Sequence, residues 1–267
     1  GKVYRGFYTA RAVLRHVFLA VPIVYFRNWH KSYRDFWMWQ GFPEAQLGRI
    51  GALARDGSGD YVFSVETSQI SATHTASGTN RILFLGAWIN GNLSRTGSTY
   101  GGVNMTNIDT QNSGNFNVYL DYIFKPSTIA SSTGTITWSG NALDAIFLMS
   151  YTGAKQSGVP DDSDVQEVGG TDLSFDAITT VADNCFIVGV VRDNQGQTST
   201  PNGIAVELYD SADGNGFWFA DTLAITPPGT QTFGRTRASG VSSQGGVCAS
   251  FAPGGVAGSG FLSALAW

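Results

Sequence analysis

The stretch RILFLGAWI, residues 81–89, decides the fold of this chain. After its first arginine the stretch is entirely apolar or glycine, and its short length between turn residues indicates a strand buried on both faces. Just before it, YVFSVETSQ (61–69) has a two-residue period that places Tyr61, Phe63 and Val65 on one face. Such alternation is typical of a half-buried strand. Residues 60–90 therefore predict β structure.

The same kind of pattern continues to the end of the chain. Short apolar or alternating segments are separated by Ser-Gly, Thr-Gly, Asp-Gly, Asn-Gly and Pro-Gly pairs, and no helical period of useful length follows residue 60. The further segments are FNVYLDYIF (116–124), TITW (135–138), AIFLMSY (145–151), LSFDAITTV (173–181), CFIVGVV (185–191), IAVELY (204–209), GFWFADTLAI (216–225), TQTFGRT (230–236) and VCASF (247–251). About eleven strands without helices predict antiparallel sheets, closed as a sandwich or a barrel.

The connections favour a sandwich. They are very uneven, short near Asn141 but long between Tyr151 and Leu173, where the polar sequence PDDSD (160–164) indicates a loop. Uneven connections favour crossings between two sheets, whereas an up-and-down barrel has regular ones. We expect an all-β fold, an antiparallel jelly-roll-type β-sandwich over residues 60–267. No internal repeat is visible in the sequence.

Charge is divided between the two ends of the chain. Residues 1–55 hold nine of the 16 Lys and Arg residues and two acids, a net charge of +7, whereas residues 56–267 carry −11. Residues 1–40 predict two short helices, and residues 41–59, with Pro43 and a closing DGSG, predict a linker. A short basic, aromatic-rich N-terminal arm of this kind indicates contact with another molecule.

The arm contains the residues with the clearest potential for binding. Its aromatic side chains recur at spacings of three and four, which places them on one helical face. The residues that we expect to anchor the chain to neighbouring subunits are Trp29, Tyr33, Phe36 and Trp37. The candidates for contact with nucleic acid or anionic lipid are Arg27, Lys31 and Arg34.

No catalytic motif appears in the sequence. His74 is the sole candidate for the histidine of a Ser-His-Asp triad within the sandwich, but no G-x-S-x-G sequence accompanies it. A glycosidase would need two carboxylates on one face of a cleft, whereas alternation places most strand acids on outward, solvated faces. These acids are Glu66, Asp121, Asp144, Asp176, Glu207 and Asp221. We therefore expect no enzyme.

Two acidic loops are weak calcium candidates. One contains Asp161, Asp162 and Asp164, and the other contains Asp210, Asp213 and Asn215. Calcium takes six to eight oxygen ligands, and turn chemistry explains Asp and Asn beside Gly equally well. No metal or cofactor is therefore expected.

Cysteine and tryptophan side chains are predicted in the core. Cys185 and Cys248 lie in apolar runs and predict two buried free thiols, since two cysteines do not make a disulfide framework. A bridge between adjacent strands is the alternative. The strand tryptophans Trp88, Trp138 and Trp218 predict core positions, with a sugar-binding platform as the alternative.

Several stretches resemble a known module in order along the chain. They are GGVNMTNIDTQ (101–111), NVYLDYIFKP (117–126), GTITWSGNALDAIFLMSYTGAKQ (134–156), ADNCFIVGVVRDN (182–194) and CASFAPG (248–254). Together they resemble a β-sandwich module that recurs in tailed-phage and related virion structural proteins. The resemblance implies a structural or surface-display role, and it does not cover residues 1–55.

These observations predict a virion structural protein, as a capsid, decoration, tail or fibre component. Its expected partners are copies of itself, in a homo-oligomer or lattice, and other virion proteins. The arm adds genome nucleic acid or an anionic membrane as possible partners. The alternatives are a secreted carbohydrate-binding module and a peripheral membrane-anchored surface protein. The expected location is the virion, or, in the alternative, outside the cell.

Overall fold

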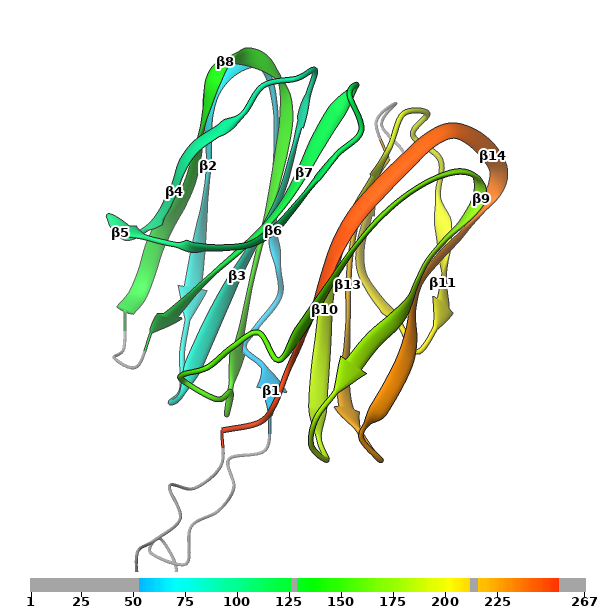
Figure 1. Ribbon diagram of the computed structural model, residues 1–267. Coiled ribbons are helices and arrows are strands. Elements are labelled where there is room, and N and C mark those ends of the chain that lie inside the picture. Colours follow the sequence, from blue (N-terminus) through cyan, green and yellow to red (C-terminus); the bar gives the residue numbers. More distant parts are fainter. Residues whose placement is uncertain (1–52, 126–128, 212–215, 255–267) are drawn as a thin grey trace, which may run out of the picture. The chain divides into compact units, whose positions relative to one another are not determined.

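The computed structural model describes residues 53–125, 129–211 and 216–254. These residues form fourteen antiparallel strands in two sheets and no helix, so the predicted all-β, sandwich-like architecture is confirmed (Figure 1). No helix that could cross a membrane occurs among them. The expected arm, 1–40, and most of the expected linker, 41–59, lie outside the described residues.

The first sheet, here called the first lobe, contains β1 to β8. Its strands are β1 (Ala54–Arg55), β2 (Asp60–Ala76), β3 (Arg81–Asn90), β4 (Arg95–Tyr100), β5 (Val103–Asn104), β6 (Thr106–Asn112), β7 (Phe116–Lys125) and β8 (Ile129–Thr152). Their order is β5-β4-β8-β3-β7-β6, and both β1 and β2 pair with β8. The predicted strands at 135–138 and 145–151 are thus one long strand, β8.

The second sheet, the second lobe, contains β9 to β14. Its strands are β9 (Asp162–Thr180), β10 (Cys185–Asp193), β11 (Ser199–Gly203), β12 (Val206–Ser211), β13 (Phe217–Ile225) and β14 (Gly229–Phe251). Their order is β11-β14-β10-β13-β12, and β9 pairs with β14. Here too, the predicted strands at 230–236 and 247–251 are one strand, and the stretch 162–164, expected in a loop, begins β9.

The two lobes repeat one pattern of strand pairing. In the first lobe β2 pairs with β8, β3 pairs with both β7 and β8, and the short strand β4 pairs with β8. In the second lobe β9 pairs with β14, β10 pairs with both β13 and β14, and the short strand β11 pairs with β14. The pairs β6–β7 and β12–β13 also correspond, and both have a register shift, between Asn107 and Asp109 and between Glu207 and Tyr209. The pairs β1–β8 and β4–β5 occur in the first lobe alone among the described residues. The repeat is invisible in the sequence because strand pairing uses backbone groups, which many side chains permit.

The connectivity differs from the repeated crossings between two sheets that the uneven connections predicted. Consecutive strands stay within one lobe, and the described chain passes between the sheets once, from β8 to β9 (Figure 1). Since β8 and β14 each pair with different strands along their two halves, each sheet folds over itself and encloses a core of its own. With the cluster between the two sheets, the described residues form three apolar clusters.

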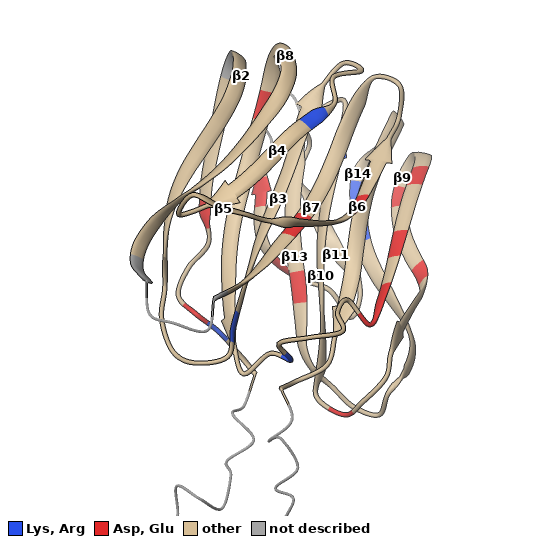
Figure 2. Ribbon diagram, turned by 60° about the vertical axis from the view of Figure 1, so that its left-hand side comes forward, with Lys and Arg blue, Asp and Glu red and all other residues tan. Residues whose placement is uncertain are grey.

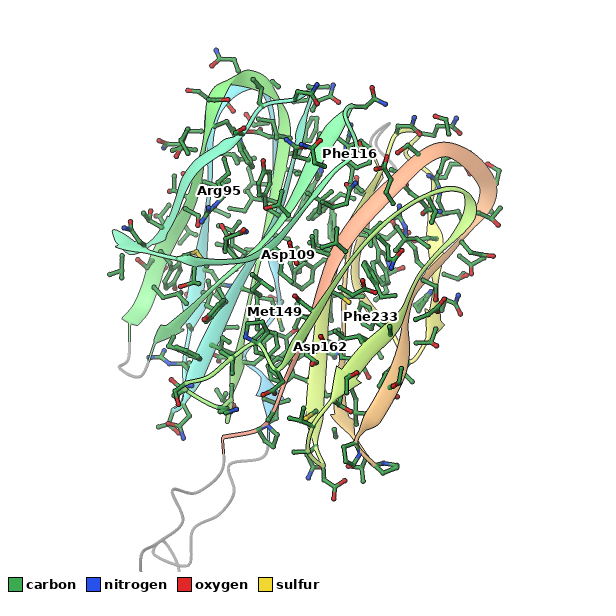
Figure 3. All side chains as sticks on the ribbon, in the orientation of Figure 1. Arg95, Asp109, Phe116, Met149, Asp162 and Phe233 are labelled. Carbon is green, nitrogen blue, oxygen red and sulfur yellow. The ribbon has the colours of Figure 1, made fainter. Side chains whose placement is uncertain are left out.

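The largest apolar cluster joins the two lobes. Side chains from β3, β7 and β8 meet side chains from β10, β13 and β14, and Phe116 and Met149 belong to this cluster, whereas Phe233 lies inside the second lobe (Figure 3). Gly86 permits this packing, because a Cβ there would lie 2.8 Å from the ring of Phe219. The predicted strand 81–89 is buried along its whole length, as expected.

The described body begins and ends at one pole. Ala54 pairs with Thr152, and Pro253 forms a bridge with Ala154, so the chain enters and leaves beside the end of β8 (Figure 1). We call this end the entry pole. The opposite end, the loop pole, holds the turns after β3, β6 and β10 and the bends of β8 and β14 (Figure 1).

Short polar strands were missed by the sequence patterns. The strands β4, β5, β6 and β11 contain mainly Thr, Ser, Asn and Gly; β4, β6 and β11 are only partly buried, and both residues of β5 are exposed. They are held in the sheets by backbone pairing to buried neighbours, and hydrophobic periodicity cannot detect such strands.

Candidate functional site

Buried charge is the most unusual property of the body. Asp121, Asp144 and Asp221, expected on solvated faces, are fully buried, whereas Asp176 and Glu207 are exposed as expected. The side chain of Glu66 lies outside the described part. The expectation failed for the three buried aspartates because each sheet has apolar packing on both faces. Figure 2 shows how sparsely charged residues are distributed over the strands, apart from the acids of β9.

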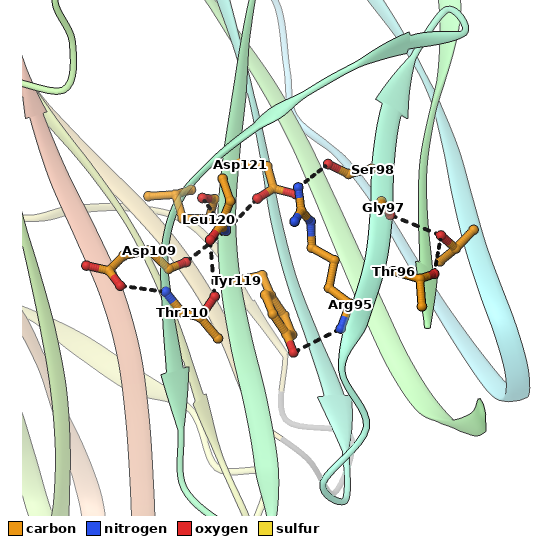
Figure 4. Close-up of polar contacts among 11 residues, drawn as sticks. Arg95, Thr96, Gly97, Ser98, Asp109, Thr110, Tyr119, Leu120 and Asp121 are labelled. Atoms are coloured by element: carbon orange, nitrogen blue, oxygen red, sulfur yellow. Dashed lines mark hydrogen bonds and ion pairs between the residues drawn. The ribbon is translucent and has the colours of Figure 1, made fainter. Parts of the chain in front are cut away.

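Asp121 on β7 forms an ion pair inside the first lobe (Figure 4). Its Oδ2 accepts a hydrogen bond of 2.8 Å from Arg95 Nε, and its Oδ1 accepts one of 2.7 Å from Asn107 Nδ2. Arg95 is fixed in turn by Ser98 Oγ, 3.2 Å from its Nη2. Burial raises the pKa of Asp121, and Arg95 opposes that shift. Every oxygen of this carboxylate has a donor, so the site is a structural pair.

Asp144 on β8 forms no ion pair with any cation of the described residues. Its Oδ2 accepts a hydrogen bond of 2.6 Å from Trp138 Nε1 and a longer one of 3.3 Å from Thr67 Oγ1. Burial raises the pKa of Asp144 to about 6, and these two hydrogen bonds only partly offset the shift. Asp144 is thus a buried carboxyl group that titrates near neutrality.

Asp221 on β13 binds Arg55 of β1 and so links the N-terminal end of the described body to the second lobe. Arg55 on β1 donates from Nε to Asp221 Oδ2 at 2.8 Å and from Nη2 to Oδ1, and Tyr151 donates its hydroxyl to Oδ2 at 2.7 Å. Asp56, which follows Arg55 in the chain, is buried and accepts hydrogen bonds from the backbone N–H and the hydroxyl of Ser77. The end of the expected linker is therefore an integral part of the body.

His74 lies between a serine and an aspartate. Its Nδ1 is 2.6 Å from Asp60 Oδ2, and its Nε2 is 2.8 Å from Ser150 Oγ. These distances are those of a Ser-His-Asp triad, but the exposure is reversed, since Ser150 is fully buried and the Asp60 side chain is 43% exposed. Ser150 Oγ also lies 3.1 Å from Asp56 Oδ2. A nucleophile must reach its substrate, so this serine links β8 to the incoming chain and is not a catalytic group.

The second lobe contains a buried group that we call the arginine cluster: Arg235 and Arg237 on β14 and Asp193 on β10. Arg235 Nη2 lies 2.8 Å from Asp193 Oδ2, and Arg237 Nη1 lies 2.7 Å from Oδ1, with all three side chains fully buried. Burial lowers the pKa of Arg235 to about 10, and Asp193 opposes that shift. A Cβ at Gly216 would lie 2.2 Å from Asp193 Oδ2, so glycine is needed beside the carboxylate.

A third arginine joins the lobes nearby. Arg192 is stacked between the rings of Trp88 and Phe116, 4.2 and 4.3 Å from their centroids, and donates from Nη2 to Asn90 Oδ1 at 3.1 Å. Burial lowers the pKa of Arg192 to about 10. Stacking of a guanidinium on aromatic faces compensates part of its lost hydration.

The calcium candidates have other roles where they are described. Asp210 accepts hydrogen bonds from the backbone and hydroxyl of Ser199 and lies in the positive field of Arg235, which is unfavourable for a bound cation. Asp213 and Asn215 lie outside the described residues. In the first candidate loop, Asp161 pairs with Lys155. No group of three or more His, Cys, Asp or Glu residues in the described ranges has the geometry of a metal site.

The remaining sequence-predicted residues divide into two groups. Cys185 and Cys248 are buried free thiols, as predicted, and Trp88, Trp138 and Trp218 are core residues. The full burial of Trp218 removes it as a sugar platform. The expected anchoring and basic residues of the arm lie outside the described part of the chain: Arg27, Trp29, Lys31, Tyr33, Arg34, Phe36 and Trp37.

The arginine cluster is the best candidate for a binding site, and sequence reasoning missed it. Arg235 and Arg237 are two residues apart in an ordinary polar stretch, FGRTRAS, and Asp193 is some 40 residues earlier. The only signal was an Arg-x-Arg pair, with the spacing that places two side chains on one face of a strand.

Comparison with protein-family models, with curated proteins and with solved structures finds no match to this chain.

Proposed function

We propose that this chain is a structural protein of a virus particle, in which the two-lobed body forms or decorates the particle surface and the N-terminal arm anchors it to neighbouring subunits. The assignment of the sandwich to the jelly-roll type and its kinship with tailed-phage modules are part of this proposal.

One observation carries the proposal: both ends of the described body are at the entry pole, next to Thr152 and Ala154. The loop pole therefore holds neither end of the described body. A body attached through segments at one pole presents the opposite pole outward, which is the geometry that a displayed module needs. The basic, aromatic-rich sequence of residues 1–40 supplies a candidate anchor.

The use of polar groups in the body supports a structural role. Most buried ionisable groups described above are fixed by partners inside the lobes, as in the Arg95–Asp121 and Arg55–Asp221 pairs. The one arrangement in the described residues that resembles a catalytic triad has its serine inside. The carbohydrate-binding alternative loses Trp218, its named sugar platform, to the core.

Particle size tests the proposal. The full chain should form oligomers or a lattice visible by electron microscopy and light scattering, and removal of residues 1–40 should leave folded monomers. The double variant Trp29→Ala with Phe36→Ala should behave like the truncated chain, because it removes part of the apolar stripe. A full chain that stays monomeric at micromolar concentration, or a truncated chain that assembles normally, contradicts the proposal.

A charge variant separates the possible partners of the arm. Replacing Arg27, Lys31 and Arg34 with Gln keeps the aromatic stripe intact. Assembly should survive this change if the arm binds protein. If attachment is lost instead, or its salt dependence flattens, the arm binds nucleic acid or anionic lipid.

A further inference from the structure

The arginine cluster has more hydrogen-bond donors than the described chain satisfies. A guanidinium presents five N–H groups and no acceptor. Arg235 Nη2 donates a hydrogen bond to Asp193, and Arg237 Nη1 forms an ion pair with Asp193 without the geometry of a hydrogen bond. Nε and Nη1 of Arg235, and Nε and Nη2 of Arg237, are buried and have no hydrogen-bond partner among the described residues.

The one carboxylate between the arginines also serves the backbone. Besides the two guanidinium contacts, Asp193 Oδ1 accepts hydrogen bonds from the backbone of Gln195 at 2.8 Å and Gly196 at 2.9 Å. Oδ2 accepts from Arg235 Nη2, and neither carboxylate oxygen accepts a hydrogen bond from Nε or Nη1 of Arg235 or from Nε or Nη2 of Arg237. Two positive side chains face one negative side chain, and all three are fully buried.

No other carboxylate in the described part of the chain completes the balance. Glu207 and Asp210 both interact electrostatically with Arg235, but neither lies within ion-pair distance of either arginine. The hydrogen bonds of the Asp210 carboxylate are with Ser199. A buried charge that lacks a partner is costly, so the cluster is incomplete as the described residues build it.

We propose that the arginine cluster is a binding site for a small inorganic anion of the size of chloride, held between the guanidinium groups of Arg235 and Arg237. The anion accepts hydrogen bonds from the N–H groups that Asp193 leaves unsatisfied, and its charge balances the second positive charge of the two arginines. Its small size follows from the full burial of the side chains that surround it. The site is independent of the proposed structural function.

Thermal unfolding of the full chain tests the site. The unfolding midpoint is measured as sodium gluconate, whose anion is too large for the cluster, is replaced by sodium chloride at constant ionic strength. Chloride should raise the midpoint and then saturate, because an anion that binds only the folded state stabilises it by mass action. Equal midpoints in the two salts would overturn the proposal.

Two variants locate the effect. In Arg237→Met the remaining Arg235–Asp193 pair is balanced, so the chloride-specific rise should vanish, while the midpoint in gluconate should equal or exceed that of the unchanged protein. Arg95→Lys, in the balanced pair of the first lobe, is the control and should keep the rise. A rise that persists in Arg237→Met contradicts the assignment.

Crystals of the unchanged protein grown in sodium bromide give a readout that needs no variant. We expect an anomalous-scattering peak within hydrogen-bond distance of both guanidinium groups. Water alone at this position would refute the proposal, whether or not Arg237→Met folds.

Discussion

At the scale of single residues, the three buried aspartates differ in how their charge is compensated. Asp121 and Asp221 each face an arginine, Arg95 and Arg55 respectively. Asp144 has only Trp138 and Thr67 as side-chain donors among the described residues. Neutral donors compensate a buried carboxylate less than a cation does, so Asp144 is the carboxyl group whose protonation should most affect stability.

Asp144→Asn should flatten the pH dependence of stability. The folded-state pKa, about 6, is above the ordinary value of 3.8, so the folded protein binds the proton more tightly than the unfolded chain. Stability due to this group is then fully present below pH ~4 and is lost as pH rises through 6, by at most about 3 kcal/mol. Urea unfolding at a series of pH values measures the effect. Asn retains an acceptor for Trp138, so the variant should be at least as stable as the unchanged protein at pH 7; an unchanged pH profile would contradict this assignment.

At the scale of elements, β1 is a short strand that is held to the body by several hydrogen bonds and an ion pair. Ala54 and Arg55 pair with the end of β8, Arg55 reaches Asp221 in the second lobe, and Asp56 accepts hydrogen bonds from Ser77. A two-residue strand has little stability of its own. The side chains of Arg55 and Asp56, rather than the backbone hydrogen bonds of β1, therefore hold this segment to both lobes.

Two truncations should separate the body from what precedes it. Removal of residues 1–52 should leave a folded body, because residues 53–254 form both sheets and all three apolar clusters. Removal of residues 1–59 also deletes Arg55 and leaves Asp221 buried without its cation. That loss should cost about 3 kcal/mol, or on the order of 10 °C in the unfolding midpoint. Circular dichroism during heating measures both, and equal midpoints would show that β1 is dispensable.

At the scale of the whole molecule, the repeated lobes are not independent. The largest apolar cluster draws Phe84 and Phe147 from the first lobe and Phe186, Phe219 and Phe251 from the second. Arg192 of the second lobe is stacked on Trp88 and Phe116 of the first. A lobe on its own would expose this shared surface to water.

The lobes should therefore unfold together. In urea, far-ultraviolet circular dichroism and tryptophan fluorescence should give coincident transitions. A fragment of residues 156–254 alone should be insoluble or poorly folded, because Phe186, Val188 and Phe219 lose the apolar cover of the first lobe. Two separate transitions, or a soluble and cooperative second lobe, would show that each repeat is a domain.

The amino-acid pattern by itself determined the all-β class, most long strands, the buried strand 81–89 and the two buried thiols, because hydrophobic periodicity and turn residues act locally along the chain. It did not reveal the polar strands, the repeated pairing or the buried aspartates. Those depend on which strands become neighbours: Asp221 is buried because Arg55 and Tyr151 meet it, and Arg235 and Arg237 form a cluster because β10 brings Asp193 between them. Only the tertiary structure decided these features, since the folding of each sheet over itself and the packing of the two lobes on one another turned faces that alternation marks as exposed into interior.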